Sequence, residues 1–181
     1  IHLAKGEWCW FLNAGDLPRD PDTVNKILSA LKPDHEHIPL HFFQAECIAP
    51  YLHYVKGAPC ETKDFLMNMP LCHQGVLYRL KYLVENNCRY DLRFPISADH
   101  ELTLRILCQL PDYLPVPFSQ IVIAKFNLDG LSSRNLFQLT DEQASIARIH
   151  FPGKSLETRL RIFRAWAICG AILFLKRLGV Y

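Results

Sequence analysis

The sequence predicts an α/β fold, in which buried strands alternate with amphipathic helices along one chain. Short apolar runs that end at turn residues recur, and the first of them, WCWFL, stops at the turn residues NAGD (residues 13–16). Between these runs lie segments whose apolar residues fall at helical spacing. Half of the 181 residues are hydrophobic and 12% are aromatic, which is enough for one folded domain with a substantial core.

Strands dominate the predicted first part of the chain. Four apolar residues between Val24 and Leu31 fall at helical spacing, so a short helix follows the first strand and ends before Pro33. The runs IPLHFFQAEC and YLHYVKG are typical of two strands in a hairpin or meander. We therefore expect, in chain order, a strand at 8–12, a helix at 24–31, strands at 38–47 and 51–57, and a short helix or turn at 62–70.

The second part of the chain is predicted to hold most of the helices. Ser97 is a candidate N-cap, and apolar residues at helical spacing follow it, so a helix is expected from near Asp99. We expect, in chain order, a strand at 74–78 that continues into a helix, the helix from near 99, a strand at 119–127, a turn at 129–133, and helices at 140–149 and 155–178. Residues 1–150 are expected to form the main domain and residues 151–181 a basic amphipathic C-terminal helix.

Charge is distributed unevenly along the chain. The net charge is +2, but residues 154–181 contain six basic residues and one acidic residue, a net of +5, so the remainder carries −3. The tail also holds an apolar run of eleven residues, 165–175, whereas a bilayer-spanning helix needs about 20. A helix lying on an anionic membrane surface and a helix packed on the main domain both fit this pattern. Because the basic residues flank a long apolar run, the pattern argues against a nucleic-acid partner.

Cysteine usage indicates a reducing compartment. Seven cysteines are scattered along the chain and never form a CxxC pair, so neither a zinc site nor a disulfide framework is expected. The chain begins with Ile1 and no signal peptide opens it, which suggests a fragment or a processed chain. We therefore expect a cytoplasmic protein, with peripheral binding to the inner face of the membrane as the further expectation from the tail.

An acidic residue, Asp16, lies at the carboxyl end of the first predicted strand. In open α/β sheets, ligands bind just outside the carboxyl ends of the strands, where a carboxylate suits a cation or a polar ligand. The same letters are also ordinary strand-ending residues, so a plain turn is the alternative interpretation. The residues alone leave both interpretations open.

Four stretches, taken in order, carry a resemblance to one protein family: AKGEWCWFLNAGD, MPLCHQGVLYR, YDLRFPISADHELTLRI and DGLSSRN. Together they resemble the C-terminal part of a family 2 glycosyltransferase of the bacterial polysaccharide-synthesis type. The resemblance covers nearly all of residues 4–135. It implies a partial GT-A domain, the Rossmann-like fold of nucleotide-diphospho-sugar transferases. It also implies an inverting enzyme that transfers a sugar from a nucleotide-diphosphate donor to a hydroxyl of a saccharide or lipid-linked acceptor, in cell-surface polysaccharide or glycolipid synthesis.

The resemblance assigns the acidic strand end to metal binding. Asn13 and Gly15 occupy positions where many relatives carry Asp, which leaves Asp16 as the strong ligand. Mg²⁺ or Mn²⁺ is held by one or two carboxylates together with substrate phosphates and waters, so this role survives the departure. The metal would neutralise charge on the departing diphosphate.

The resemblance also implies roles for residues in the second and third stretches. Asp99 matches the catalytic base, which takes the proton of the acceptor hydroxyl; a first-turn acid favoured by the helix dipole is the alternative. His73 and Gln74 match a substrate-binding pair, with a polar strand entry as the alternative. Glu101 is a weaker substrate-binding candidate, because on a helix it faces away from Asp99.

The family's nucleotide-binding half precedes the acidic strand, and the 181 residues contain no counterpart of it. The resemblance therefore implies that the first strand is a central strand whose neighbours are missing from this chain, so that a sheet edge and an apolar face are exposed. A second hypothesis follows from this absence and from the reduced acidic motif. It is a non-catalytic fragment or degenerate relative that acts as a membrane-surface or partner-binding module.

Overall fold

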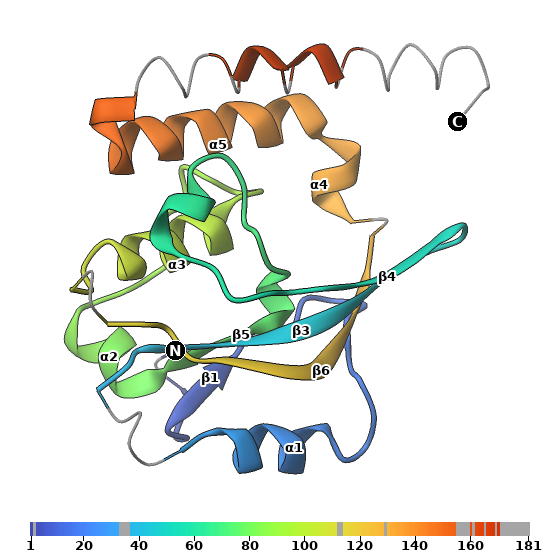
Figure 1. The fold of residues 1–181 in the computed structure, drawn as a ribbon, viewed down its shortest axis with the longest axis vertical. Coiled ribbons are helices and arrows are strands. Elements are labelled where there is room, and N and C mark those ends of the chain that lie inside the picture. The colour runs from blue at the N-terminus through green and yellow to red at the C-terminus, as the bar shows by residue number, and fades with distance from the viewer. Residues whose placement is uncertain are drawn as a thin grey trace.

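The computed structural model describes residues 1, 3–32, 37–111, 114–128 and 130–154, together with 160, 162–164, 166–168 and 170. It contains one mixed sheet with helices on both faces (Figure 1). The strands are β1 (Trp8–Trp10), β2 (Leu17–Pro18), β3 (Leu40–Ala49), β4 (Leu52–Lys56), β5 (Val76–Arg79) and β6 (Phe118–Asn127). The α-helices are α1 (Thr23–Ala30), α2 (Leu80–Glu85), α3 (Ala98–Leu107), α4 (Leu131–Arg134) and α5 (Leu136–His150), and the 3₁₀ turns are η2 (Thr62–Phe65), η3 (His73–Gly75) and η4 (Pro152–Lys154).

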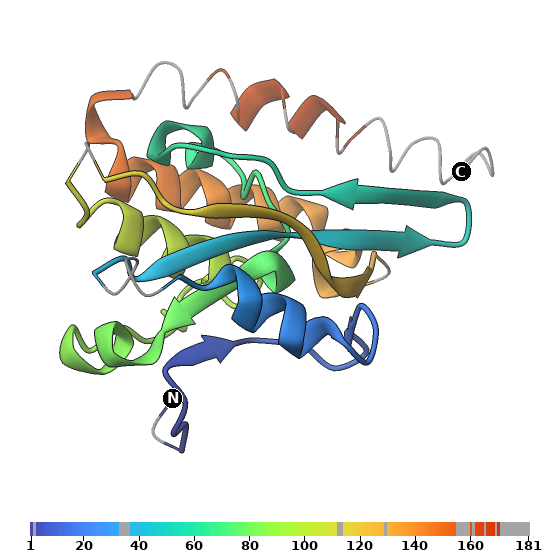
Figure 2. The same cartoon turned by 60° about the horizontal axis from the view of Figure 1, so that its bottom comes forward.

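The sheet runs in the order β1-β5-β3-β6-β2, with β4 paired to β3. Strand β5 is antiparallel to both β1 and β3, and β3 is parallel to β6, so β1, β3 and β6 all point the same way. Their carboxyl ends therefore meet at one edge of the sheet. The β3–β4 hairpin extends beyond the other strands of the sheet (Figure 2).

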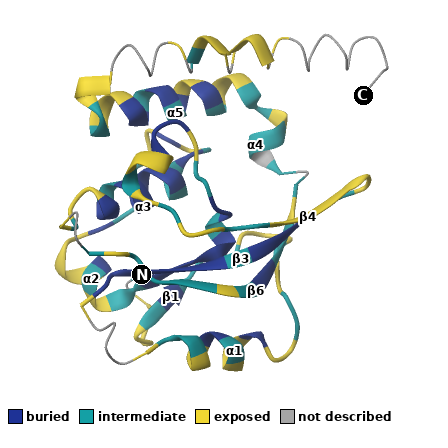
Figure 3. Ribbon diagram, in the orientation of Figure 1, coloured by how far each residue is buried: buried dark blue, intermediate teal, exposed yellow. Residues whose placement is uncertain are grey.

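Two apolar clusters cover the two faces of the sheet. On β3 the side chains alternate between them, with Phe42 in the cluster that contains residues of α2, α3 and α5, and Phe43 in the cluster that contains Ile27 of α1. Figure 3 shows buried residues concentrated in β3 and on the facing sides of α3 and α5. Because both faces of β3 are buried, apolar side chains occur on both of them, and the polar residues His41, Gln44 and Glu46 interrupt an otherwise apolar strand.

The prediction of an α/β fold is confirmed. The predicted elements are found close to their expected positions, with a few differences at the ends and in the loops. The first strand is shorter than predicted, α5 begins at Leu136 rather than at 140, and α4 occupies part of the predicted turn at 129–133. Strand β2 was not predicted, because its two residues form a strand only by pairing with Lys125 and Ala124 of β6. Strand β1 pairs with β5 alone among the described strands, so it forms an edge there, as expected.

The C-terminal helix predicted at 155–178 lies largely outside the described residues. The parts that are described are helical and run alongside α5 (Figure 1). Ile162 packs against the small cluster of Leu66, Met67 and Ala147, and the Trp166 ring lies 5.1 Å from that of Phe137. Among the described residues, no helix has the length and apolar character needed to cross a bilayer. The division into 1–150 and 151–181 stays a prediction.

Candidate active site

A cavity of about 590 Å³ opens at the sheet edge where the carboxyl ends of β1 and β6 meet. Its walls include three residues that the sequence singled out, Asp16, His73 and Asp99. They come from the turn after β1, from η3 and from the first turn of α3. The carboxyl-end position is the one that open α/β sheets use for ligands. The structure thus brings residues from three distant parts of the sequence to one cavity.

The chain around Asp16 forms a tight turn. The Asp16 amide donates to the carbonyl of Asn13 at 3.0 Å, and the Asn13 amide donates to Oδ2 of Asp16 at 3.3 Å. Gly15 has φ +94°, a left-handed conformation that a residue with a Cβ adopts only under strain. The turn carries the chain from β1 at one side of the sheet to β2 at the other. The NAGD residues therefore form a turn and also line the cavity, and the ligand-binding interpretation of Asp16 stays a prediction.

Gln74 is fully buried and does not line the cavity. Its side-chain amide donates to Oδ2 of Asp16, its Oε1 accepts from the Cys72 thiol at 2.7 Å, and its carbonyl accepts from the Trp10 indole at 2.7 Å. The structure does not place Gln74 where it would contact a substrate in this cavity. Its buried side chain contacts the Asp16 carboxylate instead. Gln74 instead fixes the orientation of the Asp16 carboxylate.

His73 and Asp99 form a hydrogen-bonded pair on the cavity wall. Nδ1 of His73 lies 2.8 Å from Oδ2 of Asp99, and 15% and 24% of the two side chains are exposed. The other ring nitrogen, Nε2, lies 2.9 Å from Nδ2 of Asn13. Gly75 makes this placement of η3 attainable, because a Cβ there would lie 2.5 Å from the carbonyl oxygen of Phe43 on β3. The imidazole is therefore held through both of its nitrogens.

The Asp99 carboxyl is held in its charged form. Burial would raise the pKa of Asp99, but the hydrogen bond and charge of His73 and a backbone N–H outweigh it, so this pKa lies below its ordinary value. Asp99 does not cap α3; Ser97 is the N-cap residue, and Glu142 of α5 accepts the amide hydrogens of Ser97 (2.8 Å) and Ile96 (3.0 Å). These two hydrogen bonds to Glu142, which the sequence did not indicate, fix the start of α3 and therefore the position of Asp99.

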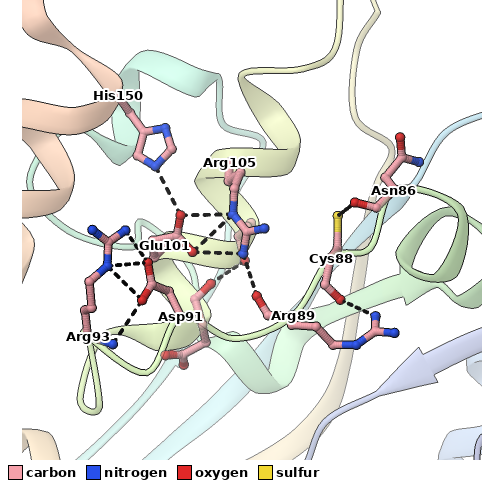
Figure 4. A network of polar contacts seen from close by, with 10 residues as sticks. Asn86, Cys88, Arg89, Asp91, Arg93, Glu101, Arg105 and His150 are labelled. Carbon is pink, nitrogen blue, oxygen red and sulfur yellow. Dashed lines mark hydrogen bonds and ion pairs between the residues drawn. The ribbon is translucent and has the colours of Figure 1, made fainter. Parts of the chain in front are cut away.

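Glu101 lies away from the cavity, in the ionic network drawn in Figure 4. Its carboxylate accepts from Nε and Nη2 of Arg105, each at 3.0 Å, and lies 3.3 Å from Nε2 of His150. Burial raises the pKa of Glu101, but these partners outweigh it and lower the pKa overall. Hydrogen bonds with Cys108 and Glu101 raise the pKa of His150 to about 9. Glu101 is thus engaged on the side of α3 that faces α5, which removes the basis for a substrate contact.

Two further aromatic residues line the cavity. Phe126 packs edge-on against the His73 ring at 5.7 Å, and the Tyr90 ring lies 5.5 Å from that of Phe11. The carboxyl-end rule could have indicated Phe126, which lies at the end of a predicted strand. No feature of the sequence indicates Tyr90, which enters the cavity from the loop between α2 and α3.

A divalent cation at the turn after β1 would have the carboxylate of Asp16 as its acidic ligand among the described residues. Among the described residues, no group of three or more His, Cys, Asp or Glu is placed to hold a metal ion. Asp16 uses Oδ2 for Gln74 and Asn13, and its Oδ1 has no hydrogen-bond partner among the described residues. This arrangement fits a Mg²⁺-type ion that takes one protein carboxylate and completes its shell with substrate phosphates and waters.

Comparison with known proteins places the chain beside glycosyltransferases. It is 27% identical over 134 residues to a PGL/p-HBAD biosynthesis glycosyltransferase from Mycobacterium tuberculosis and to a protein of the same name from Mycobacterium bovis. The match covers 74% of this chain and 50% of each relative, so the chain spans about half the length of the curated relatives it matches. No protein-family model matches the chain.

Among solved structures, the fold matches that of S. aureus TarS (residues 1–349) in complex with UDP. The TM-score is 0.51 at 12% identity, and the match covers 80% of this chain and 42% of that one. At this identity the likeness shows the fold alone. The chain therefore has the architecture of part of a GT-A-like glycosyltransferase domain, as the sequence resemblance implied.

Proposed function

We propose that the chain carries part of the active site of an inverting, metal-dependent glycosyltransferase that uses a nucleotide-diphosphate sugar. The observation that carries this proposal is the convergence of Asp16, His73 and Asp99 on one cavity at the carboxyl edge of the sheet. Relatives named glycosyltransferase and the fold shared with TarS support the same reaction class. The UDP in the TarS structure supports a uridine diphosphate sugar as the donor, and the saccharide or lipid-linked acceptor follows from the sequence resemblance.

Asp16 is proposed to bind the donor side of the reaction. Its carboxylate would hold Mg²⁺ or Mn²⁺ together with the donor diphosphate, and the ion would neutralise the charge that develops on the leaving group. Gln74 acts through Asp16, because it orients the carboxylate and does not reach the cavity. The side chain of Asn13, in the same turn, contacts Nε2 of His73 at 2.9 Å.

Asp99 and His73 are proposed to serve the acceptor side. An inverting transfer is a single displacement, in which a base removes the proton of the acceptor hydroxyl as its oxygen attacks the anomeric carbon. The hydrogen-bonded pair supplies such a base on the cavity wall. Phe126 packs against the His73 ring and limits its rotation.

The proposal is tested by measuring nucleoside diphosphate release from a panel of nucleotide sugars by the full-length gene product, with saccharide and lipid-linked acceptors and Mn²⁺. Asp16→Ala is expected to abolish release, because it removes the carboxylate ligand of this chain at the cavity. Asp141→Ala, on the exposed face of α5, is the matched control and should retain the parental rate. Full activity of Asp16→Ala, or no release by the parent with any donor, would contradict the proposal, and the second result favours the binding-module hypothesis.

A second proposal concerns the tail: its helix binds an anionic membrane surface. Ile162 and Trp166 pack toward α5, whereas the apolar side chains of Leu160, Phe163 and Ile168 are 55%, 74% and 60% exposed. The net charge of +5 in residues 154–181 complements anionic headgroups. Each basic residue near such a surface contributes about 1 kcal/mol.

Co-sedimentation with phosphatidylglycerol vesicles tests this surface. Changing Arg159, Arg161 and Arg164 to Gln is expected to weaken binding and to remove most of its salt dependence. A triple Gln variant of the exposed Lys5, Lys63 and Lys81 is the charge-matched control and should bind like the parent. Equal binding of both variants, or no binding by a folded parent, would contradict the membrane role.

A further inference from the structure

We infer that a second cavity, which shares Asp99 with the first cavity but not Asp16, is the acceptor subsite and holds one neutral sugar ring. This inference rests on the proposed glycosyltransferase function and places the acceptor within it. The second cavity has a volume of about 200 Å³. His73, Asp99 and Phe126 line both cavities, whereas Asp16 lines the first cavity and not the second.

The shared wall suits a transfer between two bound molecules. In an inverting displacement, the acceptor hydroxyl attacks the anomeric carbon from the side opposite to the leaving diphosphate. A donor whose diphosphate lies at Asp16 therefore has its acceptor beyond Asp99, in the cavity that Asp16 does not line. The proton of the acceptor O–H group moves to the Asp99 carboxylate, and the acceptor oxygen bonds to the anomeric carbon. The bond from that carbon to the donor phosphate oxygen breaks, and its electron pair leaves on the nucleoside diphosphate.

The size and the apolar part of the wall limit the occupant. Pockets for drug-sized ligands measure about 300–1,000 Å³, so the second cavity has room for one small ring rather than for an oligosaccharide. Tyr54 of β4 contributes an aromatic ring to the wall and is 40% exposed. Such a wall covers the C–H faces of a sugar ring. The aliphatic side chains around it are Met69, Leu71, Leu128 and Leu139.

Four polar groups of the same wall lack a hydrogen-bond partner among the described residues. Two are the side-chain amides of Asn68 and Gln143. The other two, Oγ of Ser97 and Nδ1 of His100, are buried. Buried polar atoms without partners are rare in folded proteins, so they mark a place where a further polar partner is expected. Sugar hydroxyls both donate and accept, and they match this mixture of amides, hydroxyl and imidazole.

The charges of the wall favour a neutral ring. Asp99 is the one carboxylate among the described residues of this wall, so an acidic sugar would bring a second negative charge beside it. Lys56 of β4 is the one lysine or arginine there, and its Nζ donates to the carbonyl of Met69 at 3.0 Å. This bond joins two parts of the wall. One carboxylate and one ammonium group balance, which leaves no net charge for an ionic sugar to complement.

The first test fills the second cavity in the full-length gene product. Gln143→Trp is expected to raise the acceptor KM by about tenfold or more and to leave the donor KM within about threefold of the parent, because the added ring occupies the acceptor subsite. Asp141→Trp, on the exposed face of the same helix, is the matched control and should keep both values.

Asn68→Trp repeats the test from an exposed position outside α5, so the result does not depend on the packing of that helix. An unchanged acceptor KM in both folded Trp variants would overturn the inference. A rise in the donor KM alone would assign the cavity to the donor and would overturn it as well.

Acceptor preference tests the class of ligand. With methyl hexosides and methyl hexuronides as acceptors, we expect kcat/KM to be about tenfold or more lower for the hexuronides, because of the Asp99 carboxylate. Asn68→Ala and Gln143→Ala should each raise the KM for a methyl hexoside by about three- to tenfold, since each removes one uncharged hydrogen bond. A preference for hexuronides would overturn the assignment of a neutral ring.

A binding measurement keeps the inference distinct from the proposed function. Saturation-transfer NMR with methyl hexosides, with and without UDP, should show ring-proton signals for the parent and for Asp141→Trp, and none for Gln143→Trp. Equal signals from all three proteins, or none from the parent under either condition, would overturn the subsite whatever the activity. Loss of hexoside binding in Gln143→Trp, beside a parent that releases no nucleotide from any donor, would support the subsite and contradict the proposed function alone.

Discussion

Two carboxylates in the first turn of α3 have opposite surroundings. Asp99 lines the cavity, is 24% exposed and has one imidazole as its side-chain partner. Glu101 is 5% exposed and is enclosed by Arg105 and His150 on the side that faces α5 (Figure 4). Two positions along a helix turn a side chain by roughly 200°, so adjacent acids of one motif face different parts of the molecule.

The difference shows how the same residue type takes a chemical or a structural role. The Glu101 carboxylate is neutralised by a bidentate guanidinium and an imidazole, which leaves no lone pair directed at the cavity. Asp99 lines the cavity itself, and the second nitrogen of its partner His73 contacts Asn13 in the turn after β1. We therefore expect substitution of Asp99 to affect activity and substitution of Glu101 to affect stability.

The largest effect is expected on the turnover of Asp99→Asn, compared with Glu101→Gln under the same conditions. Turnover should fall by roughly 10²–10⁴-fold, while the free energy of unfolding changes by less than about 1 kcal/mol, because Asn keeps the size and a hydrogen bond to His73. Glu101→Gln should keep the parental turnover within about threefold at a temperature where it is folded. Steady-state kinetics and urea unfolding of both variants check this contrast. A Glu101→Gln variant that is folded but inactive would contradict the structural role assigned to Glu101.

Glu101→Gln is expected to lower the free energy of unfolding by about 1.5–3 kcal/mol, because the ionic hydrogen bonds to Arg105 and His150 are lost. Glu85→Gln is the control, since its pair with Lys81 is exposed and spans 3.9 Å. That variant should change stability by less than about 0.5 kcal/mol. Equal stability of the two variants in urea titrations would show that the network in Figure 4 contributes no more than a surface pair.

The pH dependence of unfolding should report the same network. The pKa of His150 is raised to about 9, so its contribution is complete below the unfolded value of about 6.5 and is lost as pH rises toward 9. The pKa of Glu101 is lowered, so its contribution is present above its unfolded value of about 4.3 and is lost at lower pH. Stability from this pair should therefore be greatest between about pH 4.5 and 6.5.

Urea unfolding of the parent and of His150→Gln at pH 5.5, 7.5 and 9.5 checks this window. The parent should lose stability from the first to the last pH more steeply than His150→Gln, which lacks the titrating group. Parallel losses in the two proteins would assign the alkaline decline to other groups.

The smallest effect is expected for Arg105→Lys. Lys keeps the positive charge but not the planar fork that contacts both Glu101 oxygens and the Arg89 carbonyl. A loss of about 0.5–1.5 kcal/mol in the free energy of unfolding follows from these hydrogen bonds. No change in the urea midpoint would mean that charge alone, rather than the bidentate geometry, stabilises Glu101.

The sequence by itself determined the fold class and most of the elements. Apolar periodicity follows from which side chains must be buried, and for that reason the strand at 119–127 and the helix that begins near Asp99 lie where the patterns predicted them. The placement of Asp16 just after the first strand also followed from the sequence, because chain reversals and ligand sites lie at the carboxyl edge of such a sheet.

Only the tertiary structure decided what each polar residue of the motifs contacts. Gln74 and Glu101 match the motifs as well as His73 does, yet Gln74 lies behind Asp16 and Glu101 faces α5. The hydrogen bonds between Glu142 and the start of α3 join residues more than forty positions apart in the chain. Local patterns fix which side of a strand or helix is apolar, but the partner of a polar group is set by packing between elements, which no local spacing encodes.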